Sequence, residues 1–208
     1  MKKKENPLAE TPYNPLAKEN LGISVADAML IKPPSSLPPD KSFLGAGIYA
    51  IYYVGPFAAY EAIATKNRNK KFGVPIYVGK AIPEGARKGG SRLLGTDLYD
   101  RLREHAKSIE QTKNLKLADF FCRYLVVDDI WIPLGESLLI EKFSPVWNKL
   151  VDGFGNHDPG SGRYNQQNSL WDTIHPGRSW AVKLQPCTKS ESQILEMIRK
   201  YLAALSNS

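Results

Sequence analysis

The chain has 208 residues, with 28 Lys or Arg against 21 Asp or Glu, which gives a formal net charge of +7 and a pI near 9.3. Hydrophobic residues make up 42% and charged residues 24%, a composition that excludes a wholly disordered chain and suits one domain with extensions, or two small domains. Two cysteines are too few for a disulfide framework, and no signal-peptide pattern is seen, so a reducing cytoplasm is the expected compartment. The positive charge weakly favours a polyanionic partner such as nucleic acid.

Residues 1–44 are predicted to form a proline-rich arm. They hold seven of the 15 prolines, including the pairs at 33–34 and 38–39. Residues 23–32 are expected to form a helical turn or two, after which the proline pairs force extended chain. Such an arm would wrap a partner or its own domain.

Residues 43–60 have the length and the lack of charge of a membrane span, because none of these 18 residues is charged and about 18 is the minimum for crossing a bilayer. Gly45, Gly47, Gly55 and Pro56 interrupt this stretch, and its tyrosines would place hydroxyl groups in hydrocarbon. We therefore expect no membrane span, but a strand, a turn and the start of a helix.

Residues 45–150 are predicted to form the central domain. Leu98, Leu102, Ala106 and Ile109 recur at helical spacing and are expected to face the core, with Thr96 as the helix cap. In chain order, the predicted elements are a buried strand at 47–54, a helix from Pro56 to about 67, a strand at 75–79, a glycine-rich loop at 81–95, a helix at 97–113, a strand at 120–127 and a helix at 133–143.

Residues 151–208 are predicted to form a C-terminal extension. Its first part, residues 153–177, is a polar loop with five glycines and three asparagines, and a compact domain rarely keeps so long a loop without a function for it. A strand at 180–184 and a closing helix capped by Thr188 or Ser190 are expected to follow.

The residues able to carry chemistry occur in a recognisable order. They are the motifs Gly47-Ile48-Tyr49 and Tyr77-Val78-Gly79, then Lys80, then Arg101 and His105 four residues apart, then Glu136 and Asn148. This set resembles the GIY-YIG nuclease family, and the spacing Glu136-x3-Ile140-x4-Pro145-x2-Asn148 is similar to that family's metal-binding helix. The resemblance covers about residues 45–148, which would make residues 45–150 the catalytic domain.

The resemblance implies an α/β (α+β) fold, with a short antiparallel three-stranded sheet flanked by helices. It also implies hydrolysis of phosphodiester bonds in duplex DNA with a divalent metal ion, Mg²⁺ or possible substitute Mn²⁺. The insertions around the core, the arm and the polar loop resemble the type II restriction endonucleases of this family that cut the palindrome CCGCGG. A palindromic target favours a homodimer with two active sites. A structure-specific repair or homing-type nuclease and a catalytically inactive DNA-binding module are the alternatives.

Phosphodiester hydrolysis needs an activated water and neutralisation of the charge that develops on the phosphoryl oxygens. Glu136 is the expected metal ligand, because Mg²⁺ keeps several waters and is commonly held by one or two carboxylates plus substrate phosphate. Arg101 offers a planar fork that matches two phosphate oxygens, and we expect it to clamp the phosphate. Lys80 is expected to contact phosphate or metal-bound water, and Asn148 to brace the site through backbone hydrogen bonds.

Tyr49 is expected to take the proton from the attacking water and to relay it towards His105, while Tyr77 orients the water or the phosphate. A phenol has an ordinary pKa near 10, which is too high for a base at neutral pH without such help. The reverse assignment of the two tyrosines stays open at this stage.

Sequence specificity must come from contacts with base edges, because phosphate contacts carry no sequence information. Arg and Lys can donate two hydrogen bonds to guanine, so a GC-rich target favours cationic loop residues. His157 and His175 lack zinc-site spacing, and Cys122 is expected to be a core residue. The predicted DNA-binding residues are Arg87, Lys88, Arg92, Arg163, Asn165, Gln166, Gln167 and Arg178.

Overall fold

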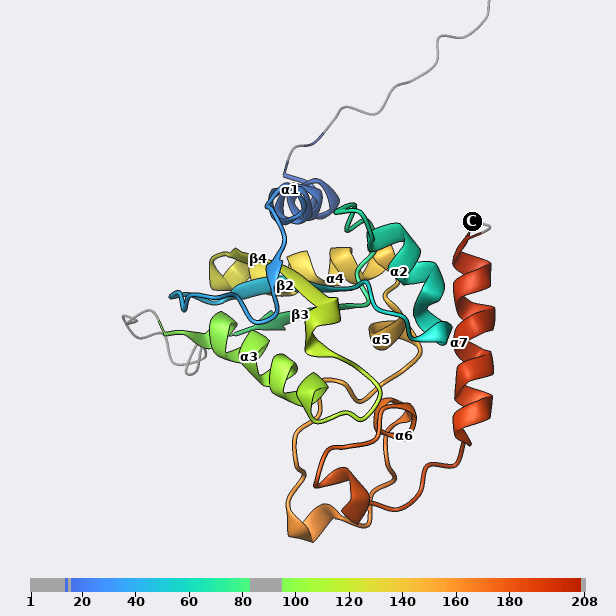
Figure 1. Cartoon of the computed structure of the whole chain (residues 1–208). Helices are drawn as coiled ribbons and strands as arrows, with labels where there is room; N and C mark the ends of the chain where they lie inside the picture. Colours follow the sequence, from blue (N-terminus) through green and yellow to red (C-terminus); the bar gives the residue numbers. More distant parts are fainter. Residues whose placement is uncertain (1–13, 15, 83–94, 207–208) are drawn as a thin grey trace, which may run out of the picture.

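The computed structural model describes residues 14, 16–82 and 95–206, and its centre is an antiparallel sheet (Figure 1). The strand order is β1-β4-β2-β3. The strands are β1 (Ser35–Ser36), β2 (Gly47–Tyr53), β3 (Tyr77–Ala81) and β4 (Phe120–Val126). The long strands are rich in β-branched and aromatic residues, which favour a pleated, buried surface.

β2 is the central strand of the domain, and all seven of its residues are buried. Because side chains alternate along a strand, Tyr49, Ile51 and Tyr53 point to one face of the sheet, and Ile48 and Ala50 point to the other. Two separate hydrophobic clusters follow from this alternation, one on each face.

Helices cover both faces of the sheet (Figure 1). The Ile48 face packs against α1 (Lys18–Leu30) and α4 (Ile132–Phe143). The Tyr49 face packs against α3 (Asp97–Glu110) and the helices of the C-terminal part. Those are α5 (Val146–Lys149), α6 (Leu170–Ile174) and α7 (Glu191–Ser206), and α2 (Glu61–Asn67) joins the same cluster.

The helix stripes follow the sequence pattern. Leu98, Leu102, Ala106 and Ile109 of α3 are all buried, as expected. Thr96 occupies the N-cap position, but its hydroxyl donates to the carboxylate of Asp100 instead of accepting from the backbone.

The closing helix α7 is preceded by a reciprocal cap, which confirms that Ser190, and not Thr188, is its N-cap residue. The Ser190 hydroxyl accepts from the backbone N–H of Gln193 at 3.3 Å, and the Gln193 side chain accepts from the Ser190 N–H at 2.9 Å. Both donors would otherwise be unpaired at the helix start.

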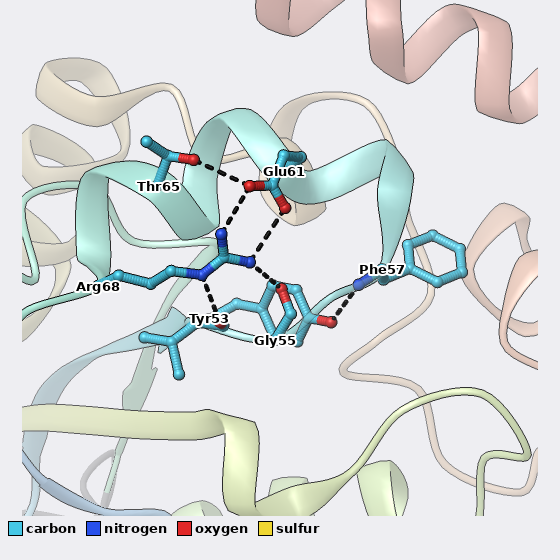
Figure 2. A network of polar contacts seen from close by, with 7 residues as sticks. Tyr53, Gly55, Phe57, Glu61, Thr65 and Arg68 are labelled. Atoms are coloured by element: carbon cyan, nitrogen blue, oxygen red, sulfur yellow. Dashed lines mark hydrogen bonds and ion pairs between the residues drawn. The ribbon is translucent and has the colours of Figure 1, made fainter.

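The turn between β2 and α2 is held by Arg68 (Figure 2). Its guanidinium forms two hydrogen bonds with the Glu61 carboxylate, at 2.6 and 3.0 Å, and also donates to the carbonyls of Val54 and Gly55. The N–H of Phe57 donates to the Tyr53 hydroxyl in the same turn. Arg68 therefore serves the fold, although it lies among Lys66, Lys70 and Lys71 in the sequence.

The structure differs from the predicted elements in its N-terminal part. The sheet has a fourth strand, because Ser35 and Ser36 pair with β4. The helix predicted at 23–32 is longer and begins at Lys18, and its Met29 lies in the hydrophobic cluster under the sheet. At Gly22 the helix lies so close to α4 that an added Cβ would overlap the Leu138 side chain.

Two predictions in other parts of the chain are also corrected. Residues 181–183 form a 3₁₀ helix instead of a strand, and this region contributes only a single bridge between Gln167 and Gln185. The helix expected from Pro56 begins at Glu61, after a 3₁₀ turn over Ala58–Tyr60. Among residues 14, 16–82 and 95–206, no helix is both long and apolar enough to cross a bilayer.

Candidate active site

Tyr49 and His105 form a buried hydrogen-bonded pair between β2 and α3. The phenol oxygen of Tyr49 lies 2.5 Å from Nε2 of His105. Burial raises the pKa of Tyr49 well above its ordinary value and lowers the pKa of His105 well below its own. Both groups are therefore neutral at rest, and in the tautomer with an unprotonated Nε2 the phenol donates and the imidazole accepts.

Gly79 makes room for this pair. It lies opposite Tyr49 in the register of β2 and β3, and an added Cβ there would collide with the phenol ring and its hydroxyl. The glycine of the Tyr77-Val78-Gly79 motif is thus required by the close approach of a side chain on the neighbouring strand.

Arg101 lies one helical turn before His105 and faces both tyrosines. Its charge opposes the burial that raises the pKa of Tyr49 and of Tyr77. On its other side, Nη1 donates to Glu104 at 2.9 Å and to Nε2 of His157 at 2.7 Å, and Nη2 donates to the carbonyl of Gly155 at 3.2 Å.

Lys80 and Glu136 approach the same edge of the sheet from the opposite face. Lys80 pairs with Ile48 in the register of β3 and therefore points towards α4, where its Nζ lies 2.6 Å from Oε2 of Glu136. Burial is the main cause of the raised pKa of Tyr77, and the Glu136 carboxylate raises it further. Lys80 and its partner Glu136 therefore lie beside the strand that also carries Tyr77.

Asn148 binds the backbone of β3 through both ends of its amide. Its oxygen accepts from the N–H of Val78 and its nitrogen donates to the carbonyl of Val78, each at 2.8 Å. Asn148 thus braces the strand that carries Tyr77 and Lys80, as the sequence predicts.

The comparison with protein families agrees with this geometry. Residues 41–202 match the model of the Eco29kI GIY-YIG domain, which is more than half of the chain. The chain belongs to the Eco29kI GIY-YIG family. It is therefore a restriction endonuclease of type II, an endodeoxyribonuclease whose substrate is DNA, and the predicted resemblance is confirmed. No curated protein matches the chain at a significant level.

Glu136 is the carboxylate of the GIY-YIG site that would hold a divalent ion. Within the described part of the chain, no group of three or more His, Cys, Asp or Glu could hold a metal. Zn²⁺ takes three or four protein ligands, whereas Mg²⁺ is held by one or two carboxylates and keeps its waters. Glu136 is partly buried and its carboxylate is paired with Lys80, so a divalent ion held by Glu136 would bind beside this ammonium or in its place.

Sequence reasoning missed two residues of this GIY-YIG site. His157 contacts Arg101, and Phe154 stacks on the imidazole of His105 with ring centroids 4.5 Å apart and 17° between the planes. Both come from the polar loop at 153–177, which the sequence marks as functional only by its length and composition.

The predicted base readers of the polar loop are exposed, with one exception. Arg163, Gln166 and Gln167 line a pocket of about 330 Å³ together with His157, and Asn165 lies exposed on the same loop. Arg87, Lys88 and Arg92 lie outside the described residues.

Arg178 is the exception, and its predicted role is corrected. Its residue is 1% exposed, and its guanidinium stacks on Trp171 at 4.2 Å from the ring centroid. It donates to the carbonyls of Gly153 and Phe154 and lies 3.5 Å from the Asp172 carboxylate. A side chain so placed cannot reach a base edge, and instead holds the loop that carries Phe154.

Proposed function

We propose that this endonuclease cuts both strands of a palindromic, GC-rich duplex, with Mg²⁺ as cofactor and Mn²⁺ as a substitute. CCGCGG is the candidate target, because Eco29kI recognises that sequence. The observation that carries the proposal is the hydrogen bond from Tyr49 to His105, with Arg101 on one side of the sheet edge and Glu136 on the other. In this arrangement Tyr49 with His105 would accept the proton, Arg101 would bind the phosphate and Glu136 would hold the metal, all at one phosphodiester.

In the proposed reaction, the Tyr49 phenol passes its proton to Nε2 of His105 while its oxygen takes a proton from the attacking water. The nearby charge of Arg101 lowers the free energy of the partial negative charge that the phenol oxygen carries between the two proton transfers. Tyr77 is half-buried beside this pair and orients the water or the phosphate.

Arg101 and Lys80 supply positive charge on the two faces of the sheet edge. Arg101 can donate to two phosphate oxygens, and Lys80 can donate to phosphate or to a bound water. A divalent ion held by Glu136 would stabilise charge on the phosphoryl oxygens as a Lewis acid.

Cutting both strands of a palindrome is best served by a homodimer, because a twofold protein places one active site on each strand. The N-terminal segment, residues 56–72 and α7 are the candidate interfaces. The exposed residues Arg163, Asn165, Gln166 and Gln167 are the proposed readers of base edges, together with Arg87, Lys88 and Arg92.

The test is a digest of a long plasmid of known sequence by the purified protein, with Mg²⁺ or with EDTA, followed by sequencing of the ends. Discrete fragments that need the metal and share one palindrome at every end are expected. Nicks confined to damaged or branched DNA would contradict the proposal in favour of a repair nuclease, and intact DNA in both reactions would contradict it in favour of a binding module.

A further inference from the structure

The loop at residues 153–158 closes over Arg101 and is firmly anchored there. Phe154 is 1% exposed and packs between His105 and Trp147, with ring centroids 4.5 Å away in each case. Arg178 holds the carbonyls of Gly153 and Phe154 from behind. The position of the next residues, Gly155 to His157, is therefore fixed by buried groups.

Two acceptors of different charge share Nη1 of Arg101. One is the carboxylate of Glu104 and the other is the imidazole of His157. An arginine only donates, so Nε2 of His157 must be unprotonated in this contact. Both acceptors are reachable from solvent, because the side chains of His157 and Glu104 are 64% and 50% exposed.

Both hydrogens of Nη1 are used by these acceptors, so a DNA phosphate that binds Arg101 at Nη1 displaces one of them. The phosphate and the Glu104 carboxylate are both anions, so they compete for the same donor and repel each other. A neutral imidazole does not repel the phosphate. It can go on accepting a hydrogen bond from one N–H of Nη1 while the phosphate accepts from the other.

We propose that His157 is a positioning residue that holds the Arg101 fork towards the scissile phosphate, while Glu104 occupies the place that the phosphate takes. The proposal rests on the proposed clamp role of Arg101. It makes the active site depend on the polar loop, beyond the stretch from the first tyrosine motif to Asn148.

The experiment compares His157→Ala with His157→Gln, whose amide oxygen can accept in place of Nε2, and with the matched variant Glu104→Gln. Single-turnover cleavage is measured with Mg²⁺ on a duplex that contains the site found in the digest, and affinity for the same duplex is measured in EDTA. His157→Ala should cut about 10–100-fold more slowly, a loss typical of a misplaced catalytic group, with affinity nearly unchanged. His157→Gln should restore most of the rate, and Glu104→Gln, which removes the competing negative charge, should bind DNA more tightly.

Three outcomes would overturn the proposal. An unchanged rate for His157→Ala would show that the contact is not used, and a failed rescue by His157→Gln would exclude an acceptor role. An affinity loss as large as the rate loss would make His157 a DNA contact instead. Failure of the proposed function would be seen separately, as absence of cleavage by the unaltered protein. A thermal melt of each variant identifies one that has lost activity because it is unfolded.

Discussion

Tyr49 and His105 show how one environment can shift two pKa values in opposite directions. Burial disfavours the charged form of each group, which is the phenolate of Tyr49 and the imidazolium of His105. The proton therefore stays on the tyrosine at rest and moves only when another proton replaces it. The transfer from Tyr49 to His105 is thus coupled to the transfer from water to Tyr49. Such coupling suits a hydrolysis in which the water is deprotonated only when it attacks the bound phosphate.

Tyr49→Phe should lower the single-turnover cleavage rate by about 10²–10⁴-fold, the usual contribution of a general base, and should leave DNA affinity in EDTA unchanged. Tyr77→Phe removes the same hydroxyl from the neighbouring ring and serves as the matched variant. It should lower the rate less, because Tyr77 is proposed only to orient the water or phosphate. A larger loss for Tyr77→Phe would reverse the two roles.

Glu136→Gln keeps the size of the side chain and removes its charge. Cleavage should be abolished at any Mg²⁺ concentration, because an amide is a poor ligand for a hard cation that is held by one carboxylate. Specific binding, measured by gel shift without metal, should persist because Glu136 reads no base. If binding and cleavage fell together, the assignment as metal ligand would be wrong.

At the level of the elements, the site depends on the close approach of β2 and β3. Gly79→Ala should abolish cleavage, because the added Cβ collides with the Tyr49 phenol, and the overpacking should cost about 1–3 kcal/mol of the free energy of unfolding. Denaturant titration and the digest measure the two effects. Gly73→Ala is the control, because its Cβ would meet nothing closer than 3.5 Å. Normal cleavage by Gly79→Ala would show that Tyr49 need not lie where it does.

The polar loop depends in the same way on a buried ion pair. Arg178→Ala removes the buried cation beside Asp172 and the donor to two carbonyls, and breaking such a pair costs about 3–5 kcal/mol of the free energy of unfolding. Arg163→Ala, at an exposed position, should change stability by less than about 0.5 kcal/mol and should weaken discrimination at one base pair by about 1–3 kcal/mol. A stable Arg178→Ala variant with altered base preference would restore Arg178 as a reader.

The sequence predicts those elements whose pattern is local. The buried stripe of α3 and the alternation of β2 are visible in single segments, and the order of the site residues from Tyr49 to Asn148 indicates the family. β1 carries no such pattern, because two serines become a strand only where β4 offers an unpaired edge. His157 meets Arg101 across 56 residues of chain, and Arg178 looks like any loop arginine until its burial is known.

Across the whole molecule, buried histidines make stability depend on pH. His175 is fully buried, accepts from the Tyr60 hydroxyl at 2.8 Å and lies 3.0 Å from the Asn114 amide oxygen, and burial followed by the charge of Arg178 lowers its pKa to about 3. In the unfolded chain the His175 imidazole takes up a proton below about pH 6.5, whereas in the folded chain it stays neutral down to about pH 3. The free energy of unfolding is therefore not reduced by this group above pH 6.5, and it falls as the pH drops from 6.5 towards 3.

His175→Gln should make the acid side of the stability curve less steep, by up to about 1.4 kcal/mol per pH unit between pH 6.5 and about 3. Glutamine can still accept from Tyr60 and donate to Asn114, so the fold at pH 8 should survive with a small loss. Urea unfolding at several pH values gives both curves. Parallel curves for the two proteins would show that His175 takes up no proton on unfolding.

The bidentate contact of Asn148 with Val78 has a consequence for how the molecule meets DNA. A sheet edge normally offers free N–H and C=O groups to any passing strand, and proteins protect such edges by covering them. Here the Asn148 amide pairs with both the N–H and the C=O of Val78, so this point on the edge of β3 is covered by one side chain. The proposal that Lys80 and Glu136 share one phosphate with Tyr77 and Arg101 requires such a thinly covered edge, because the two pairs of residues lie on opposite faces of the sheet.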